Sequence, residues 1–516
     1  MRFENGKKAL VLGAGASGAA SARFLFRRGW TVTVADTRKD PPAAKDLQNQ
    51  GIAFSGGGFD AAMLEGVSLL VLSPGLSPEF SAAAPLVAAA RERGIDTAGE
   101  IELFARELKR LAAFRAYRPV VIGITGTNGK TTTTTIVGKM AAAAGKSVCV
   151  AGNIGPNAVA ELDSRLVANE LPDVWVLELS SFQLQTTESL CCSAAAFLNL
   201  TEDHVDWHGS LQAYAEAKRK IFSPTTRRVL NGEDPEVMRS AEGVSSDLVD
   251  VFADADPDGP GQWGITREGG IEWLSYMGHA PVAKTKAAML AAEPVEKTLL
   301  MPVEALQIRG RHNAMNALAA LALATAAGIA LGPALAVLKS YKGEAHRVQS
   351  VLEAGGIEFI DDSKGTNVGA TRAALEGLGK TGRRCSIILG GDGKGQDFAP
   401  LSDVLGRWAL HAVTIGRDAP RLREVLSESG VPFEEAGSDF ERAVDLAWEA
   451  ALKEKEADPS SRPVVLLSPA CASWDMFRDY AERSARFVAR ARHLAAAHEA
   501  AVQSPGEDAC AGEEGA

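Results

Sequence analysis

Apolar residues in the first hundred positions fall into short runs separated by turn residues and helical patterns. The segment 8–35 contains an apolar run, a glycine-rich turn, an alanine-rich helical stretch and a second apolar run at 31–35. A further run at 69–72 leads into Ser73-Pro74-Gly75. Short apolar runs bounded by turns indicate buried strands, and strands that alternate with helices indicate a parallel α/β unit. We predict a first domain over residues 1–99.

The same alternation returns in the middle of the chain. A strand-loop-helix pattern begins at residue 120, and further strands are predicted at 147–151, 174–177 and 194–200. Residues 250–297 break the pattern with Gly, Pro and Asp between short apolar pieces, which favours β-hairpins or a surface insertion. We assign these segments to a second domain, 100–343.

A third α/β domain is predicted over residues 344–495, because strand and helix patterns alternate there again. Its strands are predicted at 357–360, 386–389, 412–415 and 464–467. Apolar residues between 477 and 494 recur at helical spacing, which predicts a final helix. The small and acidic residues of 496–516 predict a flexible tail.

Composition narrows the class of protein. A chain of 516 residues is too long for one hydrophobic core, and its 46% hydrophobic and 23% charged residues are typical of globular proteins. The net charge of −11 argues against a nucleic-acid-binding surface. The sequence has neither an apolar run that would span a bilayer nor a signal peptide, so we expect a cytoplasmic protein without membrane insertion. The six scattered cysteines are expected to be reduced thiols.

A glycine-rich loop lies between the predicted strand 120–124 and the predicted helix 132–144. Backbone amides beside its glycines can approach phosphate oxygens, the lysine ammonium can bind the terminal phosphates, and the first threonine hydroxyl after the lysine can bind Mg²⁺. The loop departs from GxxxxGK[ST] because Ile124 occupies the first glycine position. We predict an ATP-dependent enzyme, with an ordinary glycine-rich turn as the alternative. The loop residues are Gly126, Thr127, Asn128, Gly129, Lys130, Thr131 and Thr132.

Two acidic segments follow strands of the same predicted sheet. Glu178 comes directly after the run 174–177, at a carboxyl end of a strand, where ligands bind in open α/β sheets. Residues 199–206 come at the end of the next apolar run, and they include Asp203 and His204. Glu178 is a candidate Mg²⁺ ligand, and the second segment is a candidate for another cation or for substrate. Solvent-facing surface groups are the alternative for both.

The first domain carries a dinucleotide-type pattern. Gly13, Gly15 and Gly18 form GxGxxG, and Asp36 lies at the end of the next predicted strand. This pattern is typical of nicotinamide dinucleotide sites. A nicotinamide-dependent oxidoreductase or a nucleotide sensor is therefore an alternative function, although it leaves the phosphate loop unexplained.

Three segments taken together resemble the Mur ligases, which add amino acids to the peptidoglycan precursor. The segments are 125–132, Glu-Leu-Ser-Ser-Phe-Gln-Leu at 178–184, and Thr-Glu-Asp-His at 201–204. The resemblance covers nearly the whole chain. It implies a Rossmann-like N-terminal domain that binds the UDP part of the substrate, a central P-loop ATPase-type domain with a parallel sheet, and a Rossmann-like C-terminal domain.

Further segments resemble the branch of this family that adds D-glutamate. They are 361–367, 389–394 and 468–475, and other branches carry a histidine-containing signature in place of Asp362-Ser363-Lys364. The resemblance implies UDP-N-acetylmuramoyl-L-alanine, D-glutamate and ATP as partners of a protein that we expect to be a monomer. Ligases on the same scaffold that add L-alanine, a diamino acid, or glutamate to folate are the nearest alternative.

The resemblance also implies a mechanism. A carboxylate is a poor acylating agent, so the L-alanyl carboxylate would first accept the γ-phosphoryl group of ATP, and the D-glutamate amine would then attack the acyl phosphate. Lys130 and His204 would be catalytic. Thr131 and Glu178 would hold one Mg²⁺ between the phosphates, and His204 a second Mg²⁺ beside the acceptor carboxylate.

Lys218 matches the lysine that the family carbamylates with CO₂, which would make it both catalytic and an anionic metal ligand. It follows Tyr214 by four residues, as in the family pattern. Lys220 is a competing lysine, and a charged helix residue would ordinarily be a solvated surface group.

The remaining site residues are implied by the same resemblance. Turn-forming roles without a ligand are the alternative for Asn153 and Lys394, and an N-cap role for Asn313. Tyr480 stands where the family often has Phe. The UDP-substrate residues would be Ala16, Ser17, Asp36, Thr37, Arg38, Gly75 and Asn153. The ATP contacts beyond the loop would be Asn313, Asn316, Arg347 and Asp362, and the D-glutamate contacts Lys364, Thr366, Lys394, Ser473 and Tyr480.

Overall fold

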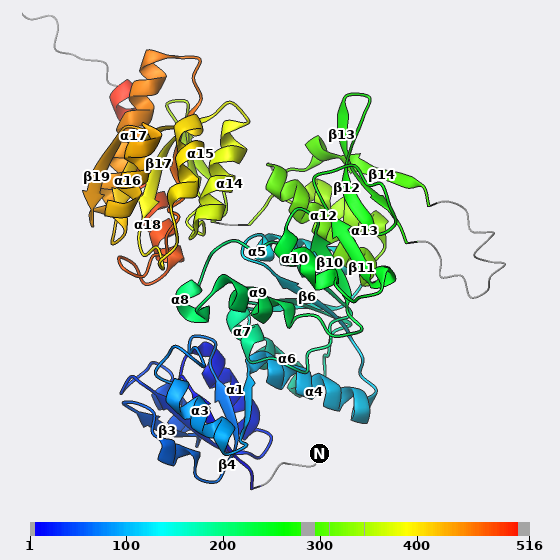
Figure 1. Cartoon of the computed structure of the whole chain (residues 1–516). Helices are drawn as coiled ribbons and strands as arrows, with labels where there is room; N and C mark the ends of the chain where they lie inside the picture. Colours follow the sequence, from blue (N-terminus) through cyan, green and yellow to red (C-terminus); the bar gives the residue numbers. More distant parts are fainter. Residues whose placement is uncertain (1–5, 280–294, 309, 345, 504–516) are drawn as a thin grey trace, which may run out of the picture. The chain divides into compact units, whose positions relative to one another are not determined.

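The computed structural model describes residues 6–279, 295–308, 310–344 and 346–503 (Figure 1). The described residues separate into two compact units, one within residues 1–308 and 313–341 and the other within residues 309–312 and 342–516. Part of the predicted hairpin segment, 280–294, and the predicted tail from 504 onward lie outside the described residues.

The first unit begins with a five-stranded parallel sheet of order β3-β2-β1-β4-β5. Helix α1 can start directly after β1 because position 18 is glycine: a Cβ on Gly18 would lie 1.8 Å from the carbonyl oxygen of Gly13. The predicted parallel α/β unit is confirmed. Its elements are β1 (Lys8–Leu12), α1 (Ala16–Phe26), β2 (Thr31–Asp36), α2 (Ala44–Asn49), β3 (Ala53–Gly56), β4 (Val67–Leu72), α3 (Ala84–Glu92) and β5 (Asp96–Gly99).

A nine-stranded sheet of order β14-β13-β12-β11-β10-β9-β6-β8-β7 follows within the described part of the same unit. The strands from β7 to β12 in this order pair in parallel, so the carboxyl ends of β9, β6, β8 and β7 lie along one edge. The strands are β6 (Val120–Thr125), β7 (Val148–Gly152), β8 (Val174–Glu178), β9 (Ala194–Phe197), β10 (Arg227–Asn231), β11 (Val249–Phe252), β12 (Gln262–Glu268), β13 (Ile271–Met277) and β14 (Lys297–Pro302).

Helices pack on both faces of this sheet. Thr, Ile, Val and Met side chains of α5 are buried, and α12 is apolar and buried over most of its length. The helices are α4 (Glu100–Arg115), α5 (Lys130–Ala143), α6 (Ala158–Ala168), α7 (Ser181–Gln185), α8 (Val205–His208), α9 (Leu211–Arg219), α10 (Pro235–Met238), α12 (Arg311–Ala326) and α13 (Leu331–Ser340).

The segment 250–297 was predicted to form β-hairpins or a surface insertion, and only the first alternative is correct. Strands β12 and β13 do form an antiparallel hairpin, and β14 pairs with β13. These strands continue the central sheet through β11, however, and do not form a separate surface piece. Their buried residues, including Trp263, Leu274 and Met301, belong to the same core as β6 and α5.

The second unit is a six-stranded sheet of order β15-β16-β20-β17-β18-β19, parallel except for β15. The predicted third α/β domain is confirmed as a fold. Its elements are β15 (Gln349–Ala354), β16 (Ile357–Asp361), α14 (Val368–Gly379), β17 (Arg384–Gly390), α15 (Ser402–Trp408), β18 (Ala409–Ile415), α16 (Ala419–Ser429), β19 (Phe433–Gly437), α17 (Phe440–Ala457), β20 (Pro463–Leu467) and α18 (Tyr480–Gln503).

Helix α18 corrects the predicted start of the tail at residue 496, because it continues to Gln503. The small residues there are mostly alanines, the best helix formers, so their composition favours helix and not a flexible chain. The His498 ring also packs edge-on against Trp448, with ring centroids 5.7 Å apart.

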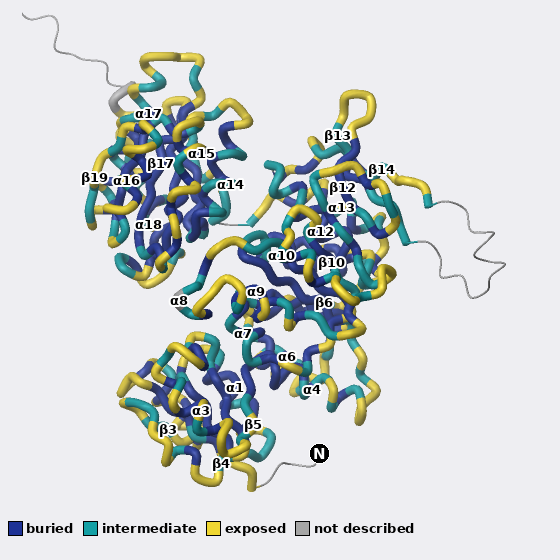
Figure 2. The backbone as a smooth tube through the Cα atoms, viewed as in Figure 1, coloured by how far each residue is buried: buried dark blue, intermediate teal, exposed yellow. Residues whose placement is uncertain are grey.

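In each unit many of the buried residues lie on the strands of the sheet. Figure 2 shows buried residues along the inner strands and exposed residues at the turns. Fully buried aromatic side chains such as Trp175 and Phe359 lie on central strands. Among the described residues, none of the helices has both the length and the apolar composition that a bilayer span requires.

Candidate active site

The predicted phosphate loop connects β6 to the N-terminus of α5. Gly129 has φ 80°, a left-handed conformation, and a Cβ there would lie 2.4 Å from the side-chain oxygen of Asn316. Glycine is therefore required for both its conformation and its lack of a side chain. The contact also brings Asn316, a predicted ATP residue, against the loop. The N-cap alternative for Asn313 is wrong, since α12 begins at Arg311; the Asn313 side-chain oxygen accepts a hydrogen bond from Asn316 Nδ2 at 3.3 Å.

Asn199 fastens the loop from the neighbouring strand end. Its side-chain oxygen accepts the backbone N–H of Asn128 at 2.8 Å, and its Nδ2 donates to the Asn128 carbonyl at 3.1 Å. The Asn199 carbonyl also accepts the Thr127 N–H at 2.9 Å. The sequence placed Asn199 in the candidate segment 199–206 but did not predict that it holds the loop. The available signal was an asparagine two residues after the end of β9.

Two lysines converge on the carbonyl of Gly126. Lys130 Nζ donates to the carbonyls of Gly126 and Thr127, each at 2.8 Å, and Lys218 Nζ donates to that of Gly126 at 2.8 Å. Lys218 is only 1% exposed. Burial, and next the charge of Lys130, lower the pKa of Lys218 well below its ordinary value. The solvated-lysine alternative is therefore wrong for Lys218.

The competing lysine has the character expected of a surface group. Lys220 is exposed, and its Nζ donates to the carbonyl of Gln185 at 2.7 Å. Lys218 instead lies over the ring of Tyr214, with Nζ 4.4 Å from the ring centroid. The fold thus brings Lys218, and not Lys220, to the phosphate loop.

Glu178 and Asn153 meet at the carboxyl ends of the adjacent strands β8 and β7. Asn153 Nδ2 donates to Glu178 Oε1 at 3.1 Å, and the Asn153 N–H donates to the Glu178 carbonyl at 2.7 Å. Glu178 is buried, at 2% exposure, and its charge raises the pKa of Lys218, against the larger effects of burial and of Lys130. These residues therefore share one edge of the sheet. Thr131, also predicted to bind Mg²⁺, is buried in the first turn of α5, and Thr132 follows it.

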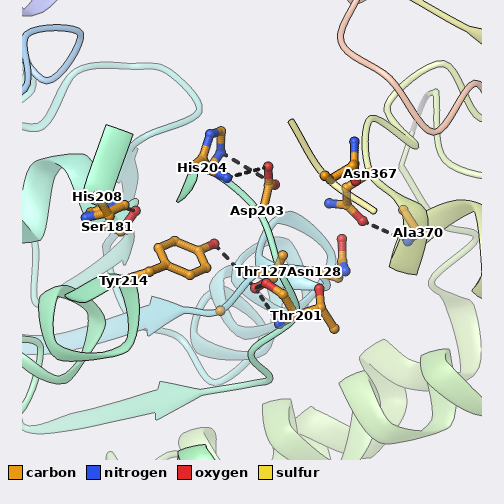
Figure 3. A network of polar contacts seen from close by, with 12 residues as sticks. Thr127, Asn128, Ser181, Thr201, Asp203, His204, His208, Tyr214, Asn367 and Ala370 are labelled. Atoms are coloured by element: carbon orange, nitrogen blue, oxygen red, sulfur yellow. Dashed lines mark hydrogen bonds and ion pairs between the residues drawn. The ribbon is translucent and has the colours of Figure 1, made fainter. Parts of the chain in front are cut away.

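The segment after β9 forms a polar and aromatic network (Figure 3). His204 has φ 55°, and its Nε2 lies 3.5 Å from Asp203 Oδ2. Its ring packs edge-on against Phe182, with centroids 4.6 Å apart. The Tyr214 hydroxyl lies 3.3 Å from Thr127 Oγ1, which connects this network to the phosphate loop.

His208 belongs to the same network, with its ring centroid 5.1 Å from that of Tyr214, and was not predicted as a site residue. Its Nε2 lies 2.9 Å from Ser181 Oγ (Figure 3). Burial, and next the charge of Lys218, lower the pKa of His208 to about 4, so the ring is neutral near pH 7. Within the described part of the chain, no three His, Cys, Asp or Glu side chains converge closely enough to form a metal site by themselves.

The predicted UDP-substrate residues of the first domain lie along one sheet edge, after β1, β2 and β4. Asp36 is buried, and its two oxygens accept the Ala14 N–H at 2.7 Å and the Arg38 guanidinium at 2.8 and 2.9 Å. The Arg38 hydrogen bonds, as the largest cause, lower the pKa of Asp36 to about 2. The Asp36 carboxylate thus holds Arg38 in place at this edge. The exposed residues of this set are Ala16, Thr37, Arg38 and Gly75, while Ser17 is partly buried.

Most of the predicted residues of the second unit lie in loops after the neighbouring strands β16, β20 and β17, while Tyr480 begins α18 and Arg347 precedes β15. Lys364 Nζ lies 5.0 Å from the centroid of the Tyr480 ring, and the N–H of Thr366 donates to the Lys364 carbonyl at 3.0 Å. Lys394 has φ 52°, and its N–H donates to Asp392 Oδ1 at 3.0 Å. These contacts place two lysines at the carboxyl edge of this sheet.

Asp362 and Ser473 are the buried members of the second unit's set. Ser468 Oγ donates to Asp362 Oδ2 at 2.6 Å, and the Val348 N–H donates to Oδ1 at 3.3 Å. Burial raises the pKa of Asp362 to about 7, although Arg347 opposes this increase. Ser473 is 3% exposed and begins the turn that leads to α18.

Arg483 is a buried cation that sequence reasoning missed. It donates to the carbonyl of Ser363 at 2.8 Å and, twice, to that of Cys471 at 3.2 Å, so it joins the loops after β16 and β20. Burial lowers the pKa of Arg483 to about 10. An arginine in a helix is ordinarily predicted to be exposed, and no feature of the sequence indicates that this one is buried.

Comparisons with known proteins agree over nearly the whole chain. Residues 7–99 match the N-terminal domain of MurD-like Mur ligases, 124–324 the Mur ligase middle domain, and 346–471 the glutamate ligase domain of Mur ligases. UDP-N-acetylmuramoylalanine--D-glutamate ligases from Burkholderia mallei and Burkholderia pseudomallei are each 48% identical over 500 residues, which cover 94% of this chain and 97% of theirs.

Solved structures agree in fold. UDP-N-acetylmuramate-alanine ligase MurC from Thermotoga maritima matches with a TM-score of 0.54 at 20% identity, covering 95% of this chain and 99% of its own. MurF from Acinetobacter baumannii matches with a TM-score of 0.55 at 18% identity, covering 95% of this chain and 92% of its own. Together with the near-complete coverage by relatives at 48% identity, the matched domains show that this chain belongs to the Mur ligase family.

Proposed function

We propose that the protein joins UDP-N-acetylmuramoyl-L-alanine to D-glutamate through an amide bond, with conversion of ATP to ADP and phosphate, in cytoplasmic peptidoglycan precursor synthesis. The observation that carries this proposal is the 48% identity, over 94% of the chain, to ligases named for this reaction. The phosphate loop fastened by Asn199 and approached by Lys130 and Lys218 supports it chemically.

The reaction needs an activated carboxylate. The L-alanyl carboxylate attacks the γ-phosphorus and ADP leaves; the D-glutamate amine then attacks the acyl carbon, loses a proton, and phosphate leaves. The protein's part is to position the reactants and neutralise developing charge. Lys130, at the start of α5, would exchange its two carbonyl contacts for phosphate oxygens.

The donor set fits Mg²⁺, which prefers hard oxygen ligands. Glu178 supplies a buried carboxylate, and Thr131 a hydroxyl at the helix N-terminus beside the phosphate loop. We assign one Mg²⁺ to these two residues and a second to His204 and Lys218. When bound, the metal would withdraw electron density from the phosphoryl group and bind the acceptor carboxylate. Phosphate oxygens and water would complete each ligand set.

The burial of Lys218 supports its proposed carbamylation. A neutral amine is the form that attacks CO₂: a nitrogen–carbon bond forms, one N–H proton is released, and the product is an anionic carbamate. Burial lowers the pKa of Lys218 well below its ordinary value, which increases the share of the neutral amine. The carbamate would carry a negative charge near Glu178, and the Lys130 ammonium together with a bound cation would offset that repulsion.

We assign each substrate to the carboxyl edge of one of the sheets. The UDP part would bind the carboxyl edge of the first sheet, and Asn153 would meet the L-alanyl end. D-glutamate carries two carboxylates, which Lys364 and Lys394 would neutralise while hydroxyl groups complete their hydrogen bonds. The proposed domains are 1–99, 100–343 and 344–495. The proposed protein is a monomer. The other ATP contacts would be Asn313, Asn316, Arg347 and Asp362, and the hydroxyl groups are those of Thr366, Ser473 and Tyr480.

Phosphate release with ATP, Mg²⁺ and UDP-N-acetylmuramoyl-L-alanine, measured across a panel of amino acids, tests the proposal. D-glutamate should support turnover and give a product whose mass equals that of the joined substrates. L-alanine, diaminopimelate and lysine should not. Turnover with one of these instead would move the protein to another branch of the family, and tight NADH binding without ATP turnover would favour an oxidoreductase.

A further inference from the structure

Glu100 is a carboxylate that the proposed reaction leaves unused. It is the first residue of α4 and only 3% exposed. Its Oε1 accepts the N–H of Ala158, the first residue of α6, at 2.9 Å. Its Oε2 is also buried. Burial raises the pKa of Glu100, and the Ser17 hydroxyl, the Ala158 N–H and the Gln183 amide oppose this rise.

Three elements meet at this carboxylate. Ser17 lies in the first turn of α1, the helix of the GxGxxG pattern, and its hydroxyl also accepts a hydrogen bond from the N-cap residue of α6, Asn157, at 3.4 Å. Gln183 lies in α7, and its Oε1 accepts the N–H and the hydroxyl of Ser180 at 3.1 Å. Ser180 comes two residues after Glu178. One side chain therefore connects the start of α1 to the turn that follows Glu178.

The other end of α1 is held independently. Arg27 and Arg28 form ion pairs with Asp163 of α6, at 2.5 and 3.0 Å, and Arg28 also pairs with Glu107 of α4 at 3.2 Å. Loss of the Glu100 carboxylate should therefore leave α1 attached to the central domain. It would free only the N-terminal end of the helix, where the UDP part of the substrate is assigned.

We propose that Glu100 is a positioning residue for the ligase reaction. It fixes the start of α1 relative to the edge that carries Glu178, so that the L-alanyl carboxylate of a UDP-bound substrate reaches the phosphate loop. This inference rests on the proposed function. A buried carboxylate is costly to keep for packing alone, and a role in the reaction would account for it.

The chain offers a matched control on the same helix. Glu102 is 2% exposed, and its Oε2 accepts the N–H groups of Glu188 and Ser189 at 2.8 Å each. It is thus a buried carboxylate of equal size that holds the segment after α7 and makes no described contact with α1. Glu102→Ala removes a comparable structural contact without touching the start of α1.

Steady-state kinetics of the full chain, varying each of the three substrates in turn, give the test. In Glu100→Ala, KM for UDP-N-acetylmuramoyl-L-alanine should rise by about ten-fold or more, while KM for ATP and for D-glutamate change by less than about two-fold. Glu100→Gln keeps the acceptor for the Ala158 N–H and should recover most of the loss. Equal KM changes in Glu100→Ala and Glu102→Ala would overturn the positioning role.

If Glu100→Ala does not fold, Glu100→Asp, whose shorter side chain withdraws the carboxylate from the Ala158 N–H, and Ser17→Ala provide a double-mutant cycle on the same KM. Coupling between the two positions would support the inference, and independent effects would overturn it. A wild-type protein that does not ligate D-glutamate would overturn the proposed function and this inference with it. If the wild type is active but the Glu100 variants change all three KM values alike, the positioning role of Glu100 is overturned and the proposed function stands.

Discussion

The side-chain amide of Asn153 donates a hydrogen bond to Glu178 Oε1 over 3.1 Å. The sequence suggested different ligands for these residues, the muramoyl-alanyl end of the substrate for Asn153 and Mg²⁺ for Glu178. Their contact means that a group assigned to substrate also orients a group assigned to metal. Groups of this kind, which hydrogen-bond a ligating carboxylate, tune metal affinity.

We therefore expect Asn153→Ala to change the Mg²⁺ requirement as well as substrate KM. Without its amide donor, the Glu178 carboxylate loses one restraint on its orientation, and the Mg²⁺ concentration for half-maximal activity should rise about ten-fold. A Mg²⁺ titration at saturating substrates measures this. Asn157→Ala is the control: it removes the α6 N-cap nearby but does not touch Glu178. Identical titrations for Asn153→Ala and wild type would contradict the assignment.

The two neighbouring lysines give the sharpest test of carbamylation. Lys218→Ala should lose at least about a hundred-fold in kcat, because both a metal ligand and a positioned charge disappear. Lys220→Ala should retain activity, since Lys220 is exposed and bonds only a backbone carbonyl. Wild-type activity should fall in CO₂-free buffer and return with bicarbonate. Bicarbonate-dependent activity that survives unchanged in Lys218→Ala would rule the carbamate out.

Gly129→Ala should weaken both the fold of the loop and ATP binding. An alanine at φ 80° costs about 1–2 kcal/mol in free energy of unfolding. Its Cβ would also displace the Asn316 side chain, which lies 2.4 Å from that position. Adding Asn316→Ala should relieve the clash but not the backbone strain, so the double variant recovers part of the stability. Denaturant unfolding and ATP KM measure the two effects; a stable single variant with wild-type KM would contradict this account.

The sequence predicted elements whose signals are local, and it missed contacts that depend on tertiary structure. Apolar runs and the glycine-rich loop indicated the strands and the phosphate site directly. Burial of Lys218 was not readable from its residue type, because a charged helix residue is ordinarily exposed and the partner carbonyl at Gly126 lies far away in the sequence. Its spacing of four residues from the buried Tyr214, on the same face of α9, was the available signal. The hydrogen bonds of Asn199 to the loop and the buried guanidinium of Arg483 are likewise long-range contacts.

Tyr480 departs from the Phe that the family often shows, and its ring lies under the Lys364 ammonium. A cation–π contact of this kind contributes about 0.5–1 kcal/mol at exposed sites. Tyr480→Leu should therefore raise KM for D-glutamate by about three-fold, and by more than Tyr480→Phe, which keeps an aromatic face. KM for UDP-N-acetylmuramoyl-L-alanine serves as the internal control. Equal D-glutamate KM values in the Leu and Phe variants would show that the ring does not position Lys364.

Asp362 should make the second unit less stable as pH rises. Its pKa is about 7 in the folded chain against an ordinary 3.8, so the folded state binds the proton more tightly. The stability that this group contributes is complete below pH 3.8 and is lost as pH rises through 7. The slope across this window is at most about 1.4 kcal/mol per pH unit, and Arg347, the nearby cation, limits the total.

Asp362→Asn stays neutral at every pH and keeps an oxygen that can accept the Ser468 hydroxyl. It should therefore lose less stability than wild type between pH 6 and pH 8, even though its ATP turnover falls. Hydrogen exchange of β16 and β20 amides at the two pH values, after correction for the intrinsic exchange rate, reports the free energy of opening for this unit alone. Asp403→Asn, a half-exposed carboxylate on α15, is the control. If wild type and Asp362→Asn show the same change between the two pH values, Asp362 is ionised throughout this range and its burial is relieved by Arg347.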